Sequence, residues 1–124
     1  GSMPPESVAA TAPFYADWVA WGKPDCWCYQ KNCRGDADGI NSGPFRVANP
    51  DLVIFLSAFN KMDAAIPAGG ICADFDHKKS GPFRVANPDL TTLLTYFNKM
   101  DATVPVCPMD WDGNGVNDYN FWTN

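Results

Sequence analysis

Aspartates occur with the same spacing in two segments of the chain, a spacing that suits a divalent cation. They are Asp36, Asp38 and Asp51 in the first segment, and Asp74, Asp76 and Asp89 in the second. Calcium takes about six to eight oxygen ligands, and a short loop supplies them when carboxylates alternate at its start and another closes it beside a helix. We therefore predict one calcium ion in each segment, with the backbone carbonyls of Arg46 and Arg84 as further ligands.

A third run of oxygen-bearing side chains lies near the C-terminal end. Its candidate ligands are Asp110, Asp112, Asn114 and Asp118. Gly115 stands where such a loop turns sharply, and either Asp118 or Asn120 could close it. An acidic, glycine-rich turn without metal is the alternative. No long helical pattern follows, so we expect at most a partial third unit over residues 107–124.

The two aspartate segments belong to a longer internal repeat. The stretch from Ser42 to Leu52 is identical to that from Ser80 to Leu90, and the same shift aligns Phe59 to Ala64 with Phe97 to Ala102. Each copy reads cysteine, Asp-x-Asp, shared block, then an apolar segment. We predict calcium repeats over residues 33–70 and 71–106 within a single domain, residues 4–124. Residues 1–3, Gly-Ser-Met, resemble an expression remnant.

The end of each repeat has the pattern of a helix. Asn49-Pro50-Asp51 and its copy offer an N-cap side chain, a proline in the first turn and an anion near the positive end of the helix dipole. Apolar residues then recur at spacings of three and four. The predicted core is Leu52, Phe55, Leu56, Phe59 and Met62, with Leu90, Leu93, Leu94, Phe97 and Met100. Val53 and Ile54 lie off this stripe and form an apolar pair on the outer face of the first helix. We expect either the aromatic N-terminal segment or a protein partner to cover them.

Composition and charge exclude several classes of protein. The 124 residues carry a net charge of −5 without a basic patch, which argues against nucleic acid as a partner. No run approaches the roughly 18 apolar residues of a membrane span. Five cysteines in so short a chain indicate disulfides, and hence secretion, although buried reduced thiols are the alternative. We expect Cys33 and Cys107, which flank the two repeats, to pair, and the odd count leaves one thiol over.

The sequence offers little for catalysis. The single histidine, His77, falls inside the second aspartate segment, where an exposed spacer is the expected role. No serine or cysteine nucleophile has an evident partner. The repeated spacing explains the carboxylates better as metal ligands than as a glycosidase pair. We therefore expect that the protein is not an enzyme.

These residues resemble a dockerin, a calcium-dependent module of two loop-plus-helix halves. Val47 and Val85 match the apolar residue through which the family's two loops pair, and Leu52 and Leu90 match the leucine after the last ligand. The resemblance covers residues 33–104. It implies a small all-α fold, a duplicated calcium loop–helix (F-hand) pair, here with aromatic, disulfide-bearing flanks.

The resemblance also implies a protein partner, a cohesin-like protein or a cell-surface assembly. The positions that would contact it are Asn49, Pro50, Asn87, Pro88, Val53, Ile54, Lys61 and Lys99. Identical residues in both halves would allow two docking orientations; recent duplication is the alternative explanation of their identity.

Each loop departs from the dockerin pattern by four inserted residues. A dockerin loop has twelve residues, whereas these have sixteen, and Ser-Gly-Pro-Phe is the expected insertion. Ile40 and Lys78 occupy the fifth position and cannot bind calcium through their side chains. A backbone oxygen, Asn41 in the first loop, or water must then replace that ligand.

Tryptophans lie only outside the repeats. They are Trp18, Trp21, Trp27, Trp111 and Trp122. Either the two ends of the chain stack on one another as a clasp over the helical core, or the aromatic rings bind carbohydrate. Three functions therefore stay open: a calcium-dependent docking module, a carbohydrate-binding module and a structural calcium spacer.

Overall fold

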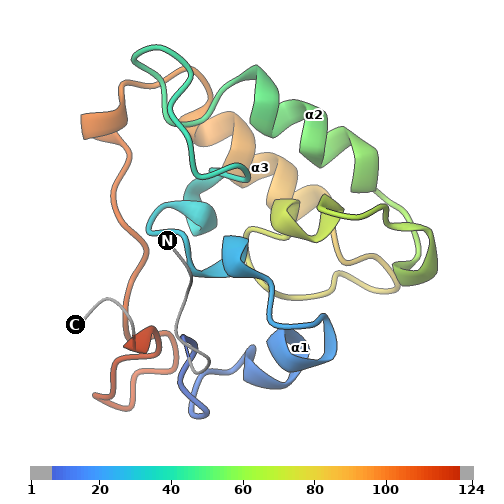
Figure 1. Ribbon diagram of the computed structural model, residues 1–124, viewed down its shortest axis with the longest axis vertical. Coiled ribbons are helices and arrows are strands. Elements are labelled where there is room, and N and C mark those ends of the chain that lie inside the picture. Colours follow the sequence, from blue (N-terminus) through green and yellow to red (C-terminus); the bar gives the residue numbers. More distant parts are fainter. Residues whose placement is uncertain (1–6, 121–124) are drawn as a thin grey trace.

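The computed structural model describes residues 7–120, so the expected expression remnant and Trp122 lie outside the described residues. Within that range the chain forms three α-helices and no strand: α1 (Tyr15–Ala20), α2 (Asn49–Ala58) and α3 (Asn87–Tyr96). Single 3-10 turns lie at Asp25–Cys28, Asn32–Arg34, Asp63–Ala65, Gly70–Ala73 and Asp101–Thr103. In Figure 1, α2 and α3 occupy one end of the molecule, and α1 lies at the other end with the C-terminal segment. The expected small, mostly helical, disulfide-containing fold is confirmed at this level.

Both long helices begin in the same way, although not at the residue expected. The N-cap positions are held by Ala48 and Ala86, so the prediction that Asn49 and Asn87 cap the helices is wrong. Asp51 Oδ2 instead accepts the Ala48 N–H at 2.8 Å. An acidic residue three positions into a helix satisfies this donor in the manner of a capping box, so an alanine suffices at the N-cap.

Both helices end before the last predicted apolar residues. Asn60 and Asn98 have φ of 54° and 56°, a left-handed conformation that asparagine tolerates better than most residues. The Asn60 N–H donates to the Val85 carbonyl at 2.8 Å, and the Asn98 N–H donates to the Val47 carbonyl at 2.7 Å. The chain after each helix is therefore drawn to the loop of the other repeat, and Met62 and Met100 are not helical.

The predicted apolar stripe is only partly the core. Of its ten residues, Phe55 and Leu93 are fully buried, whereas Leu56, Leu94, Met62 and Met100 are more than half exposed. Loop residues complete the core in their place: Ala37, Val47, Ala73, Phe75 and Val85. Each helix packs against loop residues through only part of its apolar face, and the rest of that face stays exposed to solvent.

The inserted Ser-Gly-Pro-Phe block forms a tight turn in each repeat. The Ser42 N–H donates to the Phe45 carbonyl at 2.8 Å, and the Phe45 N–H returns to the Ser42 carbonyl at 3.1 Å. Gly43 has φ of 61°, as the first central residue of a type II′ turn requires. Phe45 then forms a bridge with Met100 of the other repeat, which anchors the turn.

The aromatic flanks form a second core. Val8 pairs with Tyr119, and the Phe14 ring lies 5.4 Å from that of Trp111, so the two ends of the described chain do meet. They do not cover the helices, however, because the flank residues form a separate cluster with Trp18 and Trp27. Val53 on α2 stays 67% exposed.

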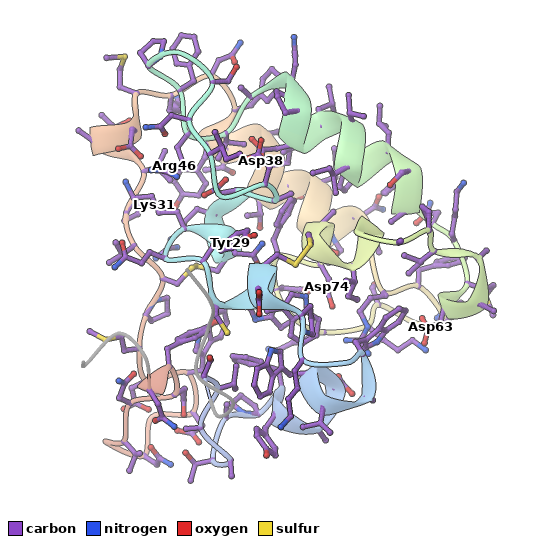
Figure 2. All side chains as sticks on the ribbon, viewed as in Figure 1. Tyr29, Lys31, Asp38, Arg46, Asp63 and Asp74 are labelled. Atoms are coloured by element: carbon purple, nitrogen blue, oxygen red, sulfur yellow. A yellow bond between two sulfur atoms is a disulfide. The ribbon has the colours of Figure 1, made fainter. Side chains whose placement is uncertain are left out.

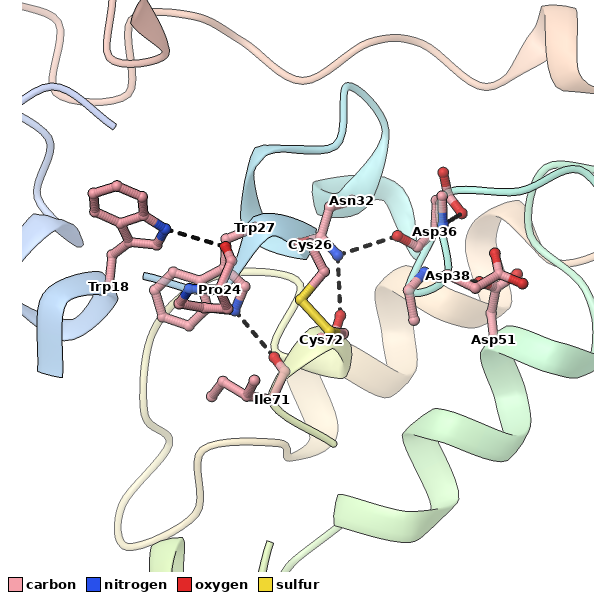
Figure 3. The surroundings of a disulfide bond; sticks show 12 residues. Trp18, Pro24, Cys26, Trp27, Asn32, Asp36, Asp38, Asp51, Ile71 and Cys72 are labelled. Atoms are coloured by element: carbon pink, nitrogen blue, oxygen red, sulfur yellow. Dashed lines mark hydrogen bonds between the residues drawn. A yellow bond between two sulfur atoms is a disulfide. The ribbon is translucent and has the colours of Figure 1, made fainter. Parts of the chain in front are cut away.

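Two disulfides join the flanks to the repeats. One links Cys33 to Cys107, the pair expected from the sequence, and the other links Cys26 to Cys72. Trp27 lies beside the second bond and donates its indole N–H to the Ile71 carbonyl at 3.0 Å (Figure 3). Cys28 forms no disulfide and is buried, and burial raises the pKa of its thiol to about 12.

The disulfides indicate an oxidising, non-cytoplasmic location. Among the described residues, no helix has both the length and the apolar character needed to cross a bilayer.

Two neighbouring leucines of α3 test this account of the core. Leu93 is 0% exposed and Leu94 is 62% exposed. We expect Leu93→Ala to lower the free energy of unfolding by about 2–5 kcal/mol, because it opens a cavity. Leu94→Ala, the matched control, should change it by less than about 0.5 kcal/mol. Urea unfolding followed by circular dichroism measures both, and equal losses would contradict the structure.

Candidate metal centre

Three groups of aspartates bring carboxylate oxygens within 4.8 Å of one another. They are Asp36, Asp38 and Asp51 in loop 1 (residues 36–51), Asp74, Asp76 and Asp89 in loop 2 (residues 74–89), and Asp110, Asp112 and Asp118 in loop 3 (residues 110–118). All nine were predicted as ligands from their spacing. Each group could hold a metal ion, because hard cations prefer clustered carboxylates.

The last aspartate ties the start of each long loop to its helix. Asp51 Oδ1 accepts the N–H groups of Ala37 at 2.7 Å and of Asp38 at 3.2 Å, while its Oδ2 accepts that of Ala48. Asp89 makes the same three contacts in loop 2, with Phe75, Asp76 and Ala86. Because both aspartates are buried, these bonds fix where the carboxylates of each group meet.

The arginines act through their side chains, which the sequence reasoning missed. Arg46 Nη1 lies 3.3 Å from Asp36 Oδ2 and donates to the Gly39 carbonyl at 3.2 Å. Arg84 Nη1 lies 3.2 Å from Asp74 Oδ2 in the equivalent position. Figure 2 shows Arg46, Asp38 and Lys31 gathered around loop 1. Each guanidinium therefore offsets part of the negative charge of its group.

Crowding and burial make these carboxylates hard to ionise. Burial, together with the Asp51 charge, raises the pKa of Asp36 to about 7, although Arg46 opposes the shift. The pKa of Asp89 rises to about 7 and that of Asp51 to about 6, both chiefly through burial. Asp74 is raised well above its usual value for the same reason. A bound cation would relieve this unfavourable arrangement.

Loop 3 is shorter, but its last aspartate also accepts a backbone N–H from the start of the loop. The Trp111 N–H donates to Asp118 Oδ2, as the Ala37 N–H does to Asp51. Asp118, one of the two predicted closing residues, thus joins Asp110 and Asp112 in the group. Asn114 lies beside the group, with its N–H donating to Asp112 Oδ1 at 3.1 Å and its amide donating to Asp112 Oδ2 at 3.1 Å. Asp110 and Asp112 are exposed, unlike the buried Asp118.

The fifth loop position brings no further side-chain ligand. Ile40 and Asn41 are both exposed, and the Ile40 backbone N–H donates to Asp38 Oδ1 at 3.0 Å. In loop 2 the Lys78 N–H donates to Asp76 Oδ1 at 3.1 Å, while the lysine side chain is exposed. In loops 1 and 2 the gathered carboxylates therefore come from three aspartates each, and none comes from the fifth position.

The predicted partner-binding residues lie at the two ends of the long helices. Asn49, Pro50, Asn87 and Pro88 are exposed in the first turns of α2 and α3, and Lys61 and Lys99 are exposed just beyond the helices. Val53 is also exposed, whereas its neighbour Ile54 packs against the core. The predicted apolar pair is thus reduced to one surface residue.

His77 is buried, so the prediction of an exposed spacer is wrong. Its ring stacks on Trp27 with centroids 4.5 Å apart, and its Nε2 lies 2.9 Å from Asn32 Oδ1. Burial, together with Arg84, lowers the pKa of His77 to about 3, which keeps the ring neutral. Asn32 in turn donates to the Asp36 and Cys72 carbonyls and so links loop 1 to loop 2. No spacing in the sequence signals this long-range pair.

Val47 and Val85 also differ from the dockerin expectation. Both are fully buried, but each accepts a hydrogen bond from the asparagine that follows the other helix, Asn98 or Asn60. Val47 forms its bridge with Phe97. The loops are thus joined through the ends of the helices.

Comparison with protein-family models, with curated proteins and with solved structures finds no match to this chain.

The raised carboxylate pKa values predict how stability depends on pH. In chelator, the folded state holds protons on Asp36 and Asp89 up to about pH 7, whereas unfolded aspartates lose them near 3.8. The folded state thus binds more protons across this window, and stability falls as pH rises through it. His77 has the opposite effect, because its lowered pKa makes stability rise with pH up to its usual pKa of 6.5. It is one group, whereas four aspartates have raised pKa values.

We therefore expect the melting temperature in chelator to fall by several degrees between about pH 5 and about pH 7.5. Saturating calcium should remove this fall, since the metal binds the ionised carboxylates. Thermal unfolding across pH, with and without calcium, measures both. A melting temperature that rises over this range in chelator would contradict the raised pKa values.

Proposed function

We propose that the chain is a non-catalytic, calcium-binding interaction module of a secreted or cell-surface protein, similar to a dockerin. The observation that carries the proposal is the presence of three separate groups of three carboxylates, each within 4.8 Å. Three such groups in 124 residues demand a shared explanation, and a divalent cation in each gives one.

Charge balance favours a divalent ion in the two long loops. Three carboxylates and the guanidinium of Arg46 leave loop 1 with two negative charges when all are ionised. Arg84 has the same effect in loop 2. One calcium ion neutralises that remainder, and backbone oxygens and water complete its coordination. Extracellular modules bind calcium at about 0.1–1 mM, so saturation outside a cell does not require tighter sites.

The duplicated surface supports docking to a protein. Asn49-Pro50 and Asn87-Pro88 are exposed at the starts of two helices that are equivalent in the repeat. A partner of the cohesin type that recognises one pair would find the same chemistry on the other. Val53 has no counterpart on α3, where Thr91 takes its place, so it would distinguish the two orientations.

The two other functions have less support. Among the described tryptophans, Trp18 and Trp27 are buried and Trp21 and Trp111 are half-buried, so they do not form a broad, open platform along which several sugars of a polysaccharide could stack. A structural calcium spacer would need the same metal groups but no partner surface. Binding of a partner therefore separates docking from the spacer.

Calcium stoichiometry tests the metal sites. We expect three ions per chain by titration calorimetry, and one fewer in each of Asp38→Asn, Asp76→Asn and Asp112→Asn. These positions are preferred because Asp36 and Asp74 also pair with arginines, so replacing them would destabilise the fold without any metal. Saturation should raise the free energy of unfolding by about 2.7 kcal/mol per site when free calcium is about 100-fold above the dissociation constant.

Asp25→Asn is the control for that experiment, since Asp25 is exposed and lies outside all three groups. It should retain three ions. A wild-type chain that binds no calcium at millimolar concentration would refute the metal hypothesis.

Docking is tested against cohesin modules in saturating calcium. Replacing Asn49 and Pro50 with alanine should weaken binding by no more than about twofold, and the same change at Asn87 and Pro88 should do likewise, because one intact copy remains. Replacing all four residues should weaken binding at least about tenfold. Asn41→Ala is the surface control. Calcium binding with no affinity for any cohesin would favour the spacer.

A further inference from the structure

A cavity of about 250 Å³ lies where the N-terminal flank, loop 2 and loop 3 meet. Phe14 and Asp17 line it from the flank, Lys78 and Arg84 from the second repeat, and Trp111 from loop 3. Ligand sites for drug-sized molecules measure about 300–1,000 Å³, so this cavity suits a single ring rather than a chain segment.

One wall of the cavity is aromatic. The rings of Phe14 and Trp111 stand 5.4 Å apart at 79°, and Trp111 is only half-buried. Phe14 is held in turn against His77, with centroids 4.5 Å apart. A rigid pair of rings of this kind offers an apolar surface to the C–H face of a sugar ring.

The opposite wall carries charges of both signs, with Asp17 and Asp76 beside Arg84 and Lys78. Arg84 is 3% exposed, and its Nη1 is fixed by Asp17 at 3.1 Å and by Asp74 at 3.2 Å. Lys78 is exposed, and within residues 7–120 its ammonium group forms no ion pair. A carboxylate entering this cavity would therefore meet an uncommitted cation at the rim.

Two buried polar atoms of this lining lack hydrogen-bond partners among the described residues. The Asn32 amide nitrogen donates to two carbonyls, so its oxygen must accept from His77 Nε2, which leaves His77 Nδ1 as an acceptor without a donor. Arg84 Nε is a buried donor without an acceptor. A hydroxyl group can serve both kinds of atom, and sugars carry several.

Loop 1 has a cavity of the same size, which provides a comparison. It is lined by Tyr29, Lys31 and Arg46, among others. Lys31 Nζ and Arg46 Nε both bind Asp101 Oδ1, at 2.9 Å and 2.8 Å, so neither cation of this cavity is unpaired. It also lacks a pair of aromatic rings. The features that favour an acidic ring-shaped ligand therefore occur beside loop 2.

We propose that the cavity between Phe14, Trp111, Lys78 and Arg84 binds one uronic-acid residue of an acidic polysaccharide. The carboxylate lies toward Lys78, and the sugar ring stacks on Trp111. This site goes beyond the docking function and is independent of it. Asp76 both lines the cavity and belongs to the loop 2 group, so calcium is kept saturating in the test to hold its charge constant.

The test follows the Trp111 indole signal by NMR while methyl galacturonoside is added. We expect saturable binding, and at least about tenfold weaker binding of the methyl galactoside, which lacks the carboxylate, and of acetate and benzoate, which lack the sugar. Lys78→Gln should weaken uronoside binding about tenfold. Lys23→Gln, at a lysine outside both this cavity lining and the predicted docking surface, should leave it unchanged.

Trp111→Ala should also reduce binding, and its thermal unfolding shows whether the fold is retained. Lys78→Gln changes only a surface side chain, so the proposal stays testable if the tryptophan variant unfolds. No saturable binding by the wild-type chain would overturn the proposal. So would equal binding of the galactoside, acetate or benzoate, or indifference to Lys78→Gln.

Discussion

Two buried aspartates, Asp51 and Asp89, hold the parts of the two repeats in register. Each accepts backbone N–H groups from the start of its loop and from the residue before its helix. Placing a carboxylate there forces two more to lie within a few ångströms. The arginine contacts and the raised pKa values both follow from that single arrangement, because crowded buried charges of one sign are unfavourable unless they are paired or protonated.

This arrangement also explains why eleven residues are identical in the two repeats. The shared block contains the type II′ turn, the arginine that meets the first aspartate, the buried valine and the closing aspartate. Each valine binds the asparagine after the other helix, and Phe45 and Phe83 bridge Met100 and Met62 across the repeats. Each copy of the block therefore makes equivalent contacts with the other repeat.

Local spacing was enough to predict the aspartate groups, both long helices and the inserted block, and the position of Cys33 and Cys107 at the two ends of the repeats was enough to predict their pairing. Local spacing failed where contacts between residues distant in sequence determine the structure. Asn60 and Asn98 end the helices because a carbonyl of the opposite loop accepts their N–H groups, and His77 is buried because Trp27 and Asn32 receive it. The arginine side chains were missed because a backbone role accounted for their position in the loop. Such contacts join residues far apart in sequence and leave no periodic signal.

The Cys33–Cys107 bond has a mechanical consequence. It closes a covalent ring around both repeats, with a sequence separation of 74 between the two cysteines. When tension is applied from the two sides of the chain, the load runs through the sulfur–sulfur bond and bypasses α2, α3 and loops 1 and 2. Only the flanks and loop 3 can extend. A pull that straightens the ends of the chain would therefore leave the aspartate groups of loops 1 and 2 and the two long helices intact.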